Sequence, residues 1–237
     1  MSAALSGYGF GMAATTNAPA VLFDIDGTLV DSNYLHVYAW QRAFAEQKIP
    51  VDAWRIHRSI GMDGSTLVND LSGGADSEVQ QRLTELHGRH YKGVAELLRP
   101  LPGARALLRR VAELGLQVVL ASSAPESELS TLRQVLDCDD VVSHVTNSED
   151  VDTAKPQPDI IEVALDRAGV TADNAVFVGD AVWDVEACVR AKVRCIGVLS
   201  GGAGRDELRN AGAIGVFEDA KELLDKIAET PLIALAP

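Results

Sequence analysis

The stretch "VLFDIDGTLVDS", residues 21–32, joins an apolar run to two closely spaced aspartates. Residues 21–23 have the character of a buried strand, in which charged side chains are disfavoured. Asp24 follows this run directly, and Asp26 repeats the carboxylate after a single isoleucine. Two acids at the end of a buried strand indicate a functional site if other polar residues converge on the same point.

The sequence after residue 100 predicts the fold class, which is α/β with a Rossmann-like parallel sheet and helices on both faces. Strand-like apolar runs alternate there with helix-like segments, and this order requires crossover connections between parallel strands. We expect strands over residues 116–122, 175–180 and 194–199, and a short one near Val141 and Val142. Helices are expected over residues 102–115, 125–136, 158–169, 182–192 and 219–229.

Residues 33–99 predict an all-helical insertion in this α/β core. Val37, Trp40 and Phe44 recur at helical spacing, whereas Pro50 and several later glycines mark breaks between helices. We expect the connections to the core near residues 30–33 and 99–102. The predicted organisation is therefore an N-terminal extension over 1–19, a core over 20–32 and 100–237, and the helical insertion over 33–99.

Composition excludes several classes of function. The net charge of −13 argues against a nucleic-acid partner, whose binders carry a basic face, and gives no attraction to an anionic membrane. No run of 18 apolar residues predicts a transmembrane helix, and residues 1–19 lack the basic start of a secretory signal. Cys138, Cys188 and Cys195 form neither a disulfide framework nor a zinc motif. We expect a cytoplasmic protein with reduced thiols, and the acidic composition favours a monomer.

Polar residues follow three of the expected strands at the point where each strand ends. "VLFD" ends at Asp24, "VVLASS" at Ser122 and "VFVGD" at Asp180. The carboxyl ends of parallel strands lie at one edge of the sheet, where ligands bind. Lys155 in "AKPQPD" and Asp184 stand at the starts of two expected helices, so we expect them at the same crevice.

The chemistry that suits this cluster is phosphoryl transfer. Carboxylates at close range need a cation, and hard oxygen ligands suit Mg²⁺, for which Asp24, Asp180 and Asp184 are the candidate ligands. A carboxylate can also be the nucleophile, which gives an aspartyl-phosphate intermediate. The turn at Gly27 allows Asp26 to swing toward a substrate.

The remaining candidates are phosphate ligands. Thr28 and Ser122 offer hydroxyl groups to phosphoryl oxygens, and Lys155 offers a positive charge for the developing negative charge. "SAPE" fits a helix-capping box of Ser123 and Glu126, which leaves Ser122 free for phosphate, although Ser123 is also counted as a candidate phosphate ligand.

The motifs "DIDGT", the strand-end Ser122, Lys155 in "KPQPD" and "GDAVWD" resemble the four ordered motifs of the haloacid dehalogenase superfamily. The resemblance covers residues 21 to about 220, and the helical insertion resembles the C1 cap of its phosphoglycolate phosphatase and β-phosphoglucomutase-like members. It implies that Asp24 is the nucleophile and Asp26 the general acid and then base. It also implies that Asp180 binds Mg²⁺ together with Asp24 and the Asp26 carbonyl, while Asp184 supports the metal shell.

An acid at position 26 also separates two reactions within this superfamily. True dehalogenases of the superfamily lack it, because a departing halide needs no proton. An alkoxide leaving group does need one, and general acid catalysis contributes roughly 10²–10⁴ in rate. Asp26 therefore favours phosphate esters as substrates.

Other interpretations of these residues remain open. "DIDG" could begin a calcium loop, but the twelfth position is Leu35 where that loop needs a glutamate. The paired aspartates could be solvated charges, Lys155 an exposed loop lysine, and Asp184 an acid favoured by the helix dipole.

Within the helical insertion, "RIHRSIGMDG" is the stretch most suited to contact a substrate. Arg58 is the candidate, because a guanidinium binds anions in a bidentate manner. Arg55 and His57 fit a solvated helical face better, and His36 is expected near the connection to the core.

The function expected from these motifs is a Mg²⁺-dependent phosphatase that hydrolyses a small phosphorylated metabolite, either a sugar phosphate or a phosphoglycolate-like monoester. The first alternative is a phosphomutase of the β-phosphoglucomutase type, which "DSNYLHVYAW" resembles. Those mutases share a Ser-Lys-Asn stretch after the motif II serine, and here residues 124–126 are Ala-Pro-Glu, without a cation for a second phosphate. The second alternative is a non-catalytic family member, although no catalytic position is missing.

Overall fold

The computed structural model of the protein describes residues 18–151, 153 and 155–236. Its strands form one parallel six-stranded sheet. The strand order is β3-β2-β1-β4-β5-β6, so β1 lies at the centre and the order reverses beside it. The predicted α/β fold class is confirmed. The strands are β1 (Ala20–Phe23), β2 (Gln117–Ala121), β3 (His144–Thr146), β4 (Ala175–Gly179), β5 (Arg194–Val198) and β6 (Gly215–Phe217).

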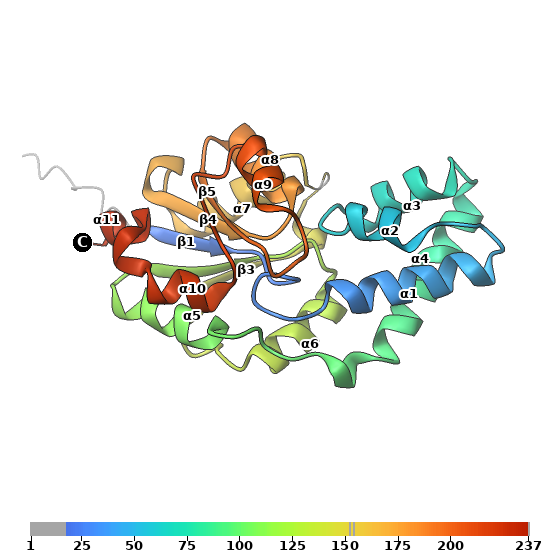
Figure 1. Ribbon diagram of the computed structural model, residues 1–237, viewed down its shortest axis with the longest axis horizontal. Coiled ribbons are helices and arrows are strands. Elements are labelled where there is room, and N and C mark those ends of the chain that lie inside the picture. Colours follow the sequence, from blue (N-terminus) through green and yellow to red (C-terminus); the bar gives the residue numbers. More distant parts are fainter. Residues whose placement is uncertain (1–17, 152, 154, 237) are drawn as a thin grey trace, which may run out of the picture.

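Helices cover both faces of the sheet (Figure 1). One face packs on α5 (Ala104–Glu113), α6 (Glu126–Leu136), α10 (Ala220–Asp225) and α11 (Pro231–Leu235). The other face packs on α7 (Asp159–Ala168), α8 (Val182–Ala191) and α9 (Arg205–Ala211). The short 3₁₀ helices are η1 (Ala95–Leu97), η2 (Ser148–Asp150), η3 (Ala172–Asn174) and η4 (Ile227–Glu229).

The apolar run before Asp24 is buried on both sides, as its composition predicts. Val21 and Phe23 belong to one apolar cluster, whereas Ala20 and Leu22 belong to the cluster on the opposite face. Such alternation follows from the period of two in a strand, and complete burial of each large side chain stabilises the fold by about 1.5–3 kcal/mol. The sheet thus has a fully buried centre that ends at Asp24.

Residues 33–99, the region expected to be a helical insertion, contain four α-helices: α1 (Asn33–Glu46), α2 (Ala53–Ser59), α3 (Gly64–Ser72) and α4 (Ser77–Lys92). Val37, Trp40 and Phe44, the predicted stripe of α1, are buried in an apolar cluster that these helices share. The two connections to the sheet lie side by side, because Asp31 N–H donates to Arg99 O and Leu101 N–H donates to Leu29 O, each at 2.9 Å. In Figure 1 these helices extend to one side of the sheet.

Several local predictions were wrong. The strand expected near Val141 and Val142 lies instead at β3, because residues 138–142 form turns in which Val141 N–H donates to Cys138 O at 3.1 Å. The helix expected over 219–229 ends at Asp225, and η4 follows. β6 and α11 were not predicted, since both are too short to show a clear period.

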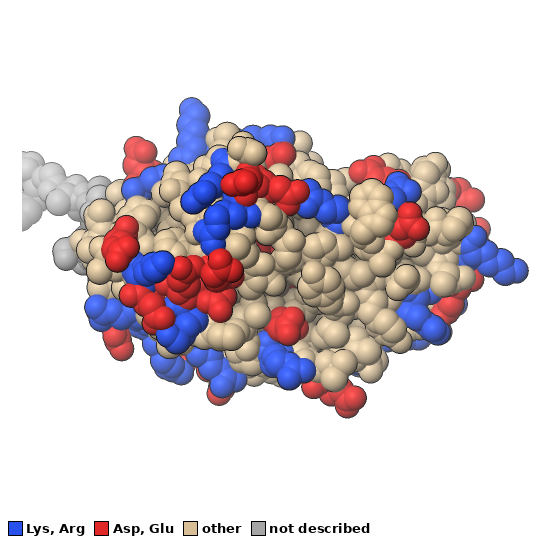
Figure 2. Space-filling view, in the orientation of Figure 1, with Lys and Arg blue, Asp and Glu red and all other residues tan. Residues whose placement is uncertain are grey.

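The distribution of charged side chains on the surface is consistent with the negative net charge of the sequence. On the face shown in Figure 2, basic and acidic side chains are interspersed and do not gather into a basic patch. Among the described residues, no helix has the length and apolarity needed to cross a membrane. Residues 1–17 of the predicted N-terminal extension lie outside the described residues.

Candidate active site

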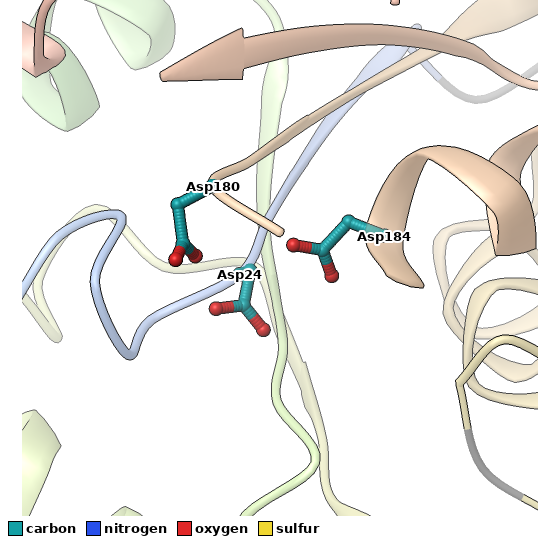
Figure 3. Close-up of side chains that lie close together, drawn as sticks. All are labelled: Asp24, Asp180 and Asp184. Carbon is teal, nitrogen blue, oxygen red and sulfur yellow. The ribbon is translucent and has the colours of Figure 1, made fainter. Parts of the chain in front are cut away.

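Three carboxylates meet at the carboxyl edge of the sheet. Asp24 follows β1 and Asp180 follows β4, and these strands pair with Phe23 opposite Val178, so their ends are level. Asp184 lies in the first turn of α8, where its carboxylate accepts from Ala181 N–H at 3.0 Å. Each of the three acids offers one oxygen within 4.8 Å of the others, and Figure 3 shows them converging. All three side chains are buried.

Lys155 is the cation at this cluster. Its Nζ donates to Asp24 Oδ1 at 2.6 Å and lies 2.7 Å from Asp184 Oδ1. Burial would lower the pKa of the Lys155 ammonium, but Asp184 and Asp24 raise this pKa above its usual range. The side chain is therefore a charged ammonium inside the protein, as the phosphoryl-transfer hypothesis requires. It is not an exposed loop lysine.

The single positive charge of Lys155 does not balance the negative charges of Asp24, Asp180 and Asp184. Burial raises the pKa of Asp24 well above its usual range, with contributions from the neighbouring acids, although Lys155 opposes the rise. Burial and the charge of Asp184 raise the pKa of Asp180 to about 7. Hard carboxylate oxygens that are buried and short of positive charge are a donor set that fits a divalent cation. The cluster can hold a metal ion.

Asp180 is fixed by two side chains from the segment after β1. Thr28 Oγ1 donates to Asp180 Oδ1 at 2.9 Å, and Asn33 Nδ2 donates to Asp180 Oδ2 at 2.8 Å. Thr28, a predicted phosphate ligand, is thus bonded to the carboxylate cluster in this structure. The sequence analysis did not identify Asn33 as a site residue, although Asn33 directly follows the stretch of residues 21–32 that carries the aspartates. The backbone at Gly201 closes the site, since a Cβ there would lie 1.6 Å from Asp180 Oδ2.

Asp26 is oriented by residues at the start of the insertion. Its Oδ1 accepts from Ser32 Oγ at 2.5 Å and lies 3.2 Å from His36 Nε2. Burial alone would raise the pKa of Asp26, but His36 and Ser32 lower it below its usual range. Burial likewise disfavours the charged form of His36. The Asp26 carboxylate nonetheless raises the pKa of His36 above its usual range. Neither Ser32 nor the bond of His36 to Asp26 was predicted from the sequence.

His36 begins an array of stacked rings inside the insertion. A hydrogen bond joins His36 Nδ1 and His87 Nε2 at 3.1 Å. The His36 ring stacks on Tyr91 at 4.0 Å and the His87 ring stacks on Trp40 at 4.1 Å, both between centroids. Burial lowers the pKa of His87 well below its usual range. Helices α1 and α4 are thereby locked together next to Asp26.

Ser122 and Ser123, the two serines that follow β2, differ in their hydrogen bonding. Ser122 is fully buried, and its Oγ accepts from Ala124 N–H at 3.0 Å. Ser123 Oγ is buried, has no hydrogen-bond partner among the described residues and lines the cavity that contains Asp24. The predicted capping box of Ser123 and Glu126 is wrong, because α6 begins at Glu126 with Pro125 as its N-cap. The Glu126 carboxylate accepts from Asn147 Nδ2 at 2.8 Å instead.

Arg58 lies on α2 and forms an ion pair with Glu207 of α9, with Nη2 2.8 Å from Oε1. It lines a second cavity of about 310 Å³ between α2 and the loops after β4 and β5, and it does not line the cavity at Asp24. His57 Nε2 lies 2.9 Å from Gly201 O at the same place. A substrate-binding role for Arg58 stays a prediction.

The cavity at the carboxylates has a volume of about 310 Å³ and lies between the sheet edge and the insertion. Asp24, Asp26, Asp180 and Ser123 form its floor. Most of the predicted candidates therefore come together around one cavity, either in its lining or in contact with the lining acids. The exceptions are Arg58 and Ser122, whose hydroxyl accepts from Ala124 N–H. The site can position a nucleophilic carboxylate, a second acid and a cation around one small ester.

The family of the chain follows from comparison with known proteins. The haloacid dehalogenase-like hydrolase family matches residues 18–192, so the chain belongs to this family, and the expected class of enzyme, a hydrolase of this superfamily, is confirmed. Phosphoglycolate phosphatase of Rhodospirillum rubrum is 30% identical over 87% of this chain and 89% of its own length. Phosphorylated carbohydrates phosphatase of Thermotoga maritima is 27% identical over 89% and 98% of the two chains.

Solved structures agree with the fold. A hydrolase from Pseudomonas syringae matches with a TM-score of 0.85 and 36% identity, over 89% of this chain and 98% of its own. A β-phosphoglucomutase from Clostridium difficile matches with a TM-score of 0.78 over 90% and 96% of the two chains, and at 20% identity it shows the fold alone.

Proposed function

We propose that this hydrolase is a Mg²⁺-dependent phosphatase that cleaves a small phosphorylated metabolite through an aspartyl-phosphate intermediate. One observation carries the proposal: the Asp24 carboxylate lines the cavity at the sheet edge, with Lys155 Nζ 2.6 Å from one of its oxygens. The ammonium holds Oδ1, which leaves Oδ2 for attack on phosphorus. The phosphatase names of the relatives support the class of reaction.

Two carboxylates divide the chemistry. Asp24 forms a bond to phosphorus as the bond from phosphorus to the leaving oxygen breaks, and Asp26 protonates that oxygen. Because His36 and Ser32 lower the pKa of Asp26, this carboxyl must take up a proton as the substrate binds before it can act as the acid. Asp26 then accepts a proton from water, whose oxygen attacks phosphorus and frees Asp24 and inorganic phosphate. Ser32 and His36 keep the Asp26 carboxyl oriented through both steps.

The remaining predicted residues bind the phosphoryl oxygens or hold the cation that neutralises their charge. We assign Ser122, Ser123 and Thr28 to the phosphoryl oxygens, of which Ser123 has an unpartnered hydroxyl in the cavity. Asp24, Asp180, Asp184 and the Asp26 carbonyl would hold Mg²⁺, which when bound neutralises the acids and the phosphoryl charge.

The proposal extends to the organisation of the chain. Residues 33–99 act as a cap domain over the core of residues 20–32 and 100–237, moving about the paired connections near residues 30–33 and 99–102. Arg58, now paired with Glu207, becomes available to an anionic substrate when the cap moves. We further propose a monomeric cytoplasmic enzyme that acts on a small metabolite, with no nucleic-acid or membrane partner.

The test is hydrolysis of p-nitrophenyl phosphate with Mg²⁺, with EDTA, and by the Asp24→Asn variant. We expect turnover that requires the metal and that falls by at least about 10³ in the variant, because the nucleophile is lost. Asp70→Asn, an exposed aspartate of α3, is the matched control and should behave as the wild type. Turnover that persists in EDTA or in Asp24→Asn contradicts the mechanism.

A further inference from the structure

The cavity beyond the phosphoryl site has an unusual charge balance. Its walls on the insertion side are largely apolar, with Trp40, Ile60, Met62 and Leu67, and the polar side chains there are those of Asn33, His36, Thr84 and His87. Helix α6 adds Ser127 and Glu128 from the opposite side. None of the described residues that line this cavity is a lysine or an arginine.

Glu128 is the charged group on this wall that the proposed reaction does not use. Its side chain is 15% exposed, and the basic group recorded nearest to it is His87 Nδ1 at 3.8 Å. Since burial keeps the pKa of His87 low, this imidazole is neutral at pH 8 and does not neutralise the glutamate. His36 also acts on Glu128 electrostatically, but its Nε2 faces Asp26. Glu128 therefore presents a carboxylate to whatever fills the cavity.

The position of a substrate follows from the floor of the cavity. With phosphorus at Asp24, the leaving group extends between the apolar wall of α1 and α3 and the polar wall of α6. A second anionic group on the leaving alcohol would meet Glu128 and no lining lysine or arginine, because the Nε2 of His36, the imidazole of α1 in the lining, already faces Asp26. Hydroxyl groups, in contrast, can donate to Glu128 and accept from Ser127 and Thr84, while the carbon chain packs against Trp40.

We propose that this cavity selects phosphate monoesters of uncharged, hydroxyl-bearing alcohols, of the polyol or sugar class, and that Glu128 rejects esters that carry a second anionic group. The inference rests on the proposed phosphatase function and narrows its substrate class. It sets this chain apart from relatives named for phosphoglycolate, an ester whose leaving alcohol carries a carboxylate. A like charge at about 5 Å in a partly solvated site weakens binding by about tenfold or more.

The experiment compares two esters that differ in one group. Glycerol 3-phosphate and 3-phosphoglycerate have the same length and carry a hydroxymethyl group or a carboxylate at the same end. Each is tested at pH 8 as a competitive inhibitor of p-nitrophenyl phosphate hydrolysis, so that an inhibition constant is obtained with or without turnover. We expect glycerol 3-phosphate to bind at least about tenfold more tightly to the wild type.

Glu128→Gln tests the assigned residue. This variant should reduce the ratio of the two inhibition constants by about tenfold, mainly through tighter binding of 3-phosphoglycerate. The matched control is Glu126→Gln, which removes the same charge from the same helix at an exposed position outside the cavity lining, and it should keep the wild-type ratio. Thermal unfolding of both variants checks that each is folded.

The outcomes separate the two proposals. Absence of hydrolysis of p-nitrophenyl phosphate by the wild type is a failure of the phosphatase function itself. Hydrolysis accompanied by equal or tighter binding of 3-phosphoglycerate, by no inhibition from glycerol 3-phosphate, or by an unchanged ratio in Glu128→Gln overturns the assignment of the leaving-group pocket.

Discussion

At the scale of single residues, Lys155 shows how function and stability are linked. Its ammonium is fully buried and touches two carboxylates, at 2.6 and 2.7 Å. A buried charge is tolerated only when its partners compensate the lost hydration. The residue that we propose to neutralise a phosphoryl group therefore also keeps Asp24 and Asp184 together in the folded chain.

Removal of this ammonium should destabilise the protein. We expect Lys155→Met to lower the free energy of unfolding in EDTA by about 3 kcal/mol, because two buried acids lose their cation. Urea denaturation measures the change. Lys226→Met removes an exposed lysine that is paired with Glu222 on the surface, and its effect should stay within about 0.5 kcal/mol. A loss for Lys155→Met no larger than that of this control would contradict the assigned role.

At the scale of elements, the loop between β5 and α9 completes the site from a strand that contributes no acid. Gly201 lies in this loop, and a Cβ at this position would overlap the Asp180 carboxylate and approach Asn33 Nδ2 to 2.8 Å. The close approach of backbone to carboxylate explains the glycine at this position. A short loop thus limits the position of the Asp180 carboxylate, which follows the neighbouring strand β4.

Gly201→Ala should displace Asp180 and reduce kcat/KM for p-nitrophenyl phosphate by about 10²-fold, as a displacement of roughly 1 Å in a catalytic site does. Gly204→Ala is the control in the same loop, since its Cβ would meet the flexible end of Glu207 at 3.2 Å. Steady-state kinetics of the two variants check this expectation. Equal activity of both variants would show that the loop does not position the carboxylate.

The prediction of elements succeeded where the sequence period was long and clear. The stripe of Val37, Trp40 and Phe44 predicted α1, because a helix repeats its buried face over several turns. It failed at β3, where two adjacent valines suggested a strand while turn hydrogen bonds hold them in a loop. It also failed at Ser123, because the backbone conformation at Pro125, and not the pattern S-x-x-E, decides where α6 begins.

At the scale of the whole molecule, the carboxylate cluster links segments that lie far apart in the chain. Asp24, Asp180 and Asp184 come from three elements, and Lys155 comes from a fourth segment. In the folded chain their mutual repulsion opposes folding unless a cation is present. Binding of a metal to the folded state should then stabilise the entire protein.

Mg²⁺ should raise the melting temperature in a saturable manner, and EDTA should reverse the increase. At a concentration of 100 times Kd the stabilisation is about 2.7 kcal/mol. Thermal unfolding of the wild type and of Asp180→Asn measures this effect, and the variant should lose most of the Mg²⁺-dependent shift. Asp70→Asn, whose exposed carboxylate is outside the cluster, should retain it. A shift that is equal in all three proteins would show that the ion acts elsewhere.

The sequence alone determined the alternation of strands and helices after residue 100, apart from β6 and α11, and the acids at the strand ends. These are local properties, because burial dictates the period of apolar residues and a strand end dictates where polar residues can follow. It also determined the family, through the residues of "DIDGT", Ser122, Lys155 and "GDAVWD". Each of these signals lies within a few consecutive residues and needs no contact to be recognised.

Only the tertiary structure decided which side chains complete the site. Asn33, Ser32 and His36 reach Asp180 and Asp26 because the connection after β1 folds back over the sheet edge. Glu128 meets the insertion because α6 packs below it, and Arg58 meets Glu207 instead of the cavity. Such contacts join residues that are distant in sequence. Their geometry depends on how the helices of residues 33–99 pack against the sheet edge and α6, and no local sequence pattern encodes this packing.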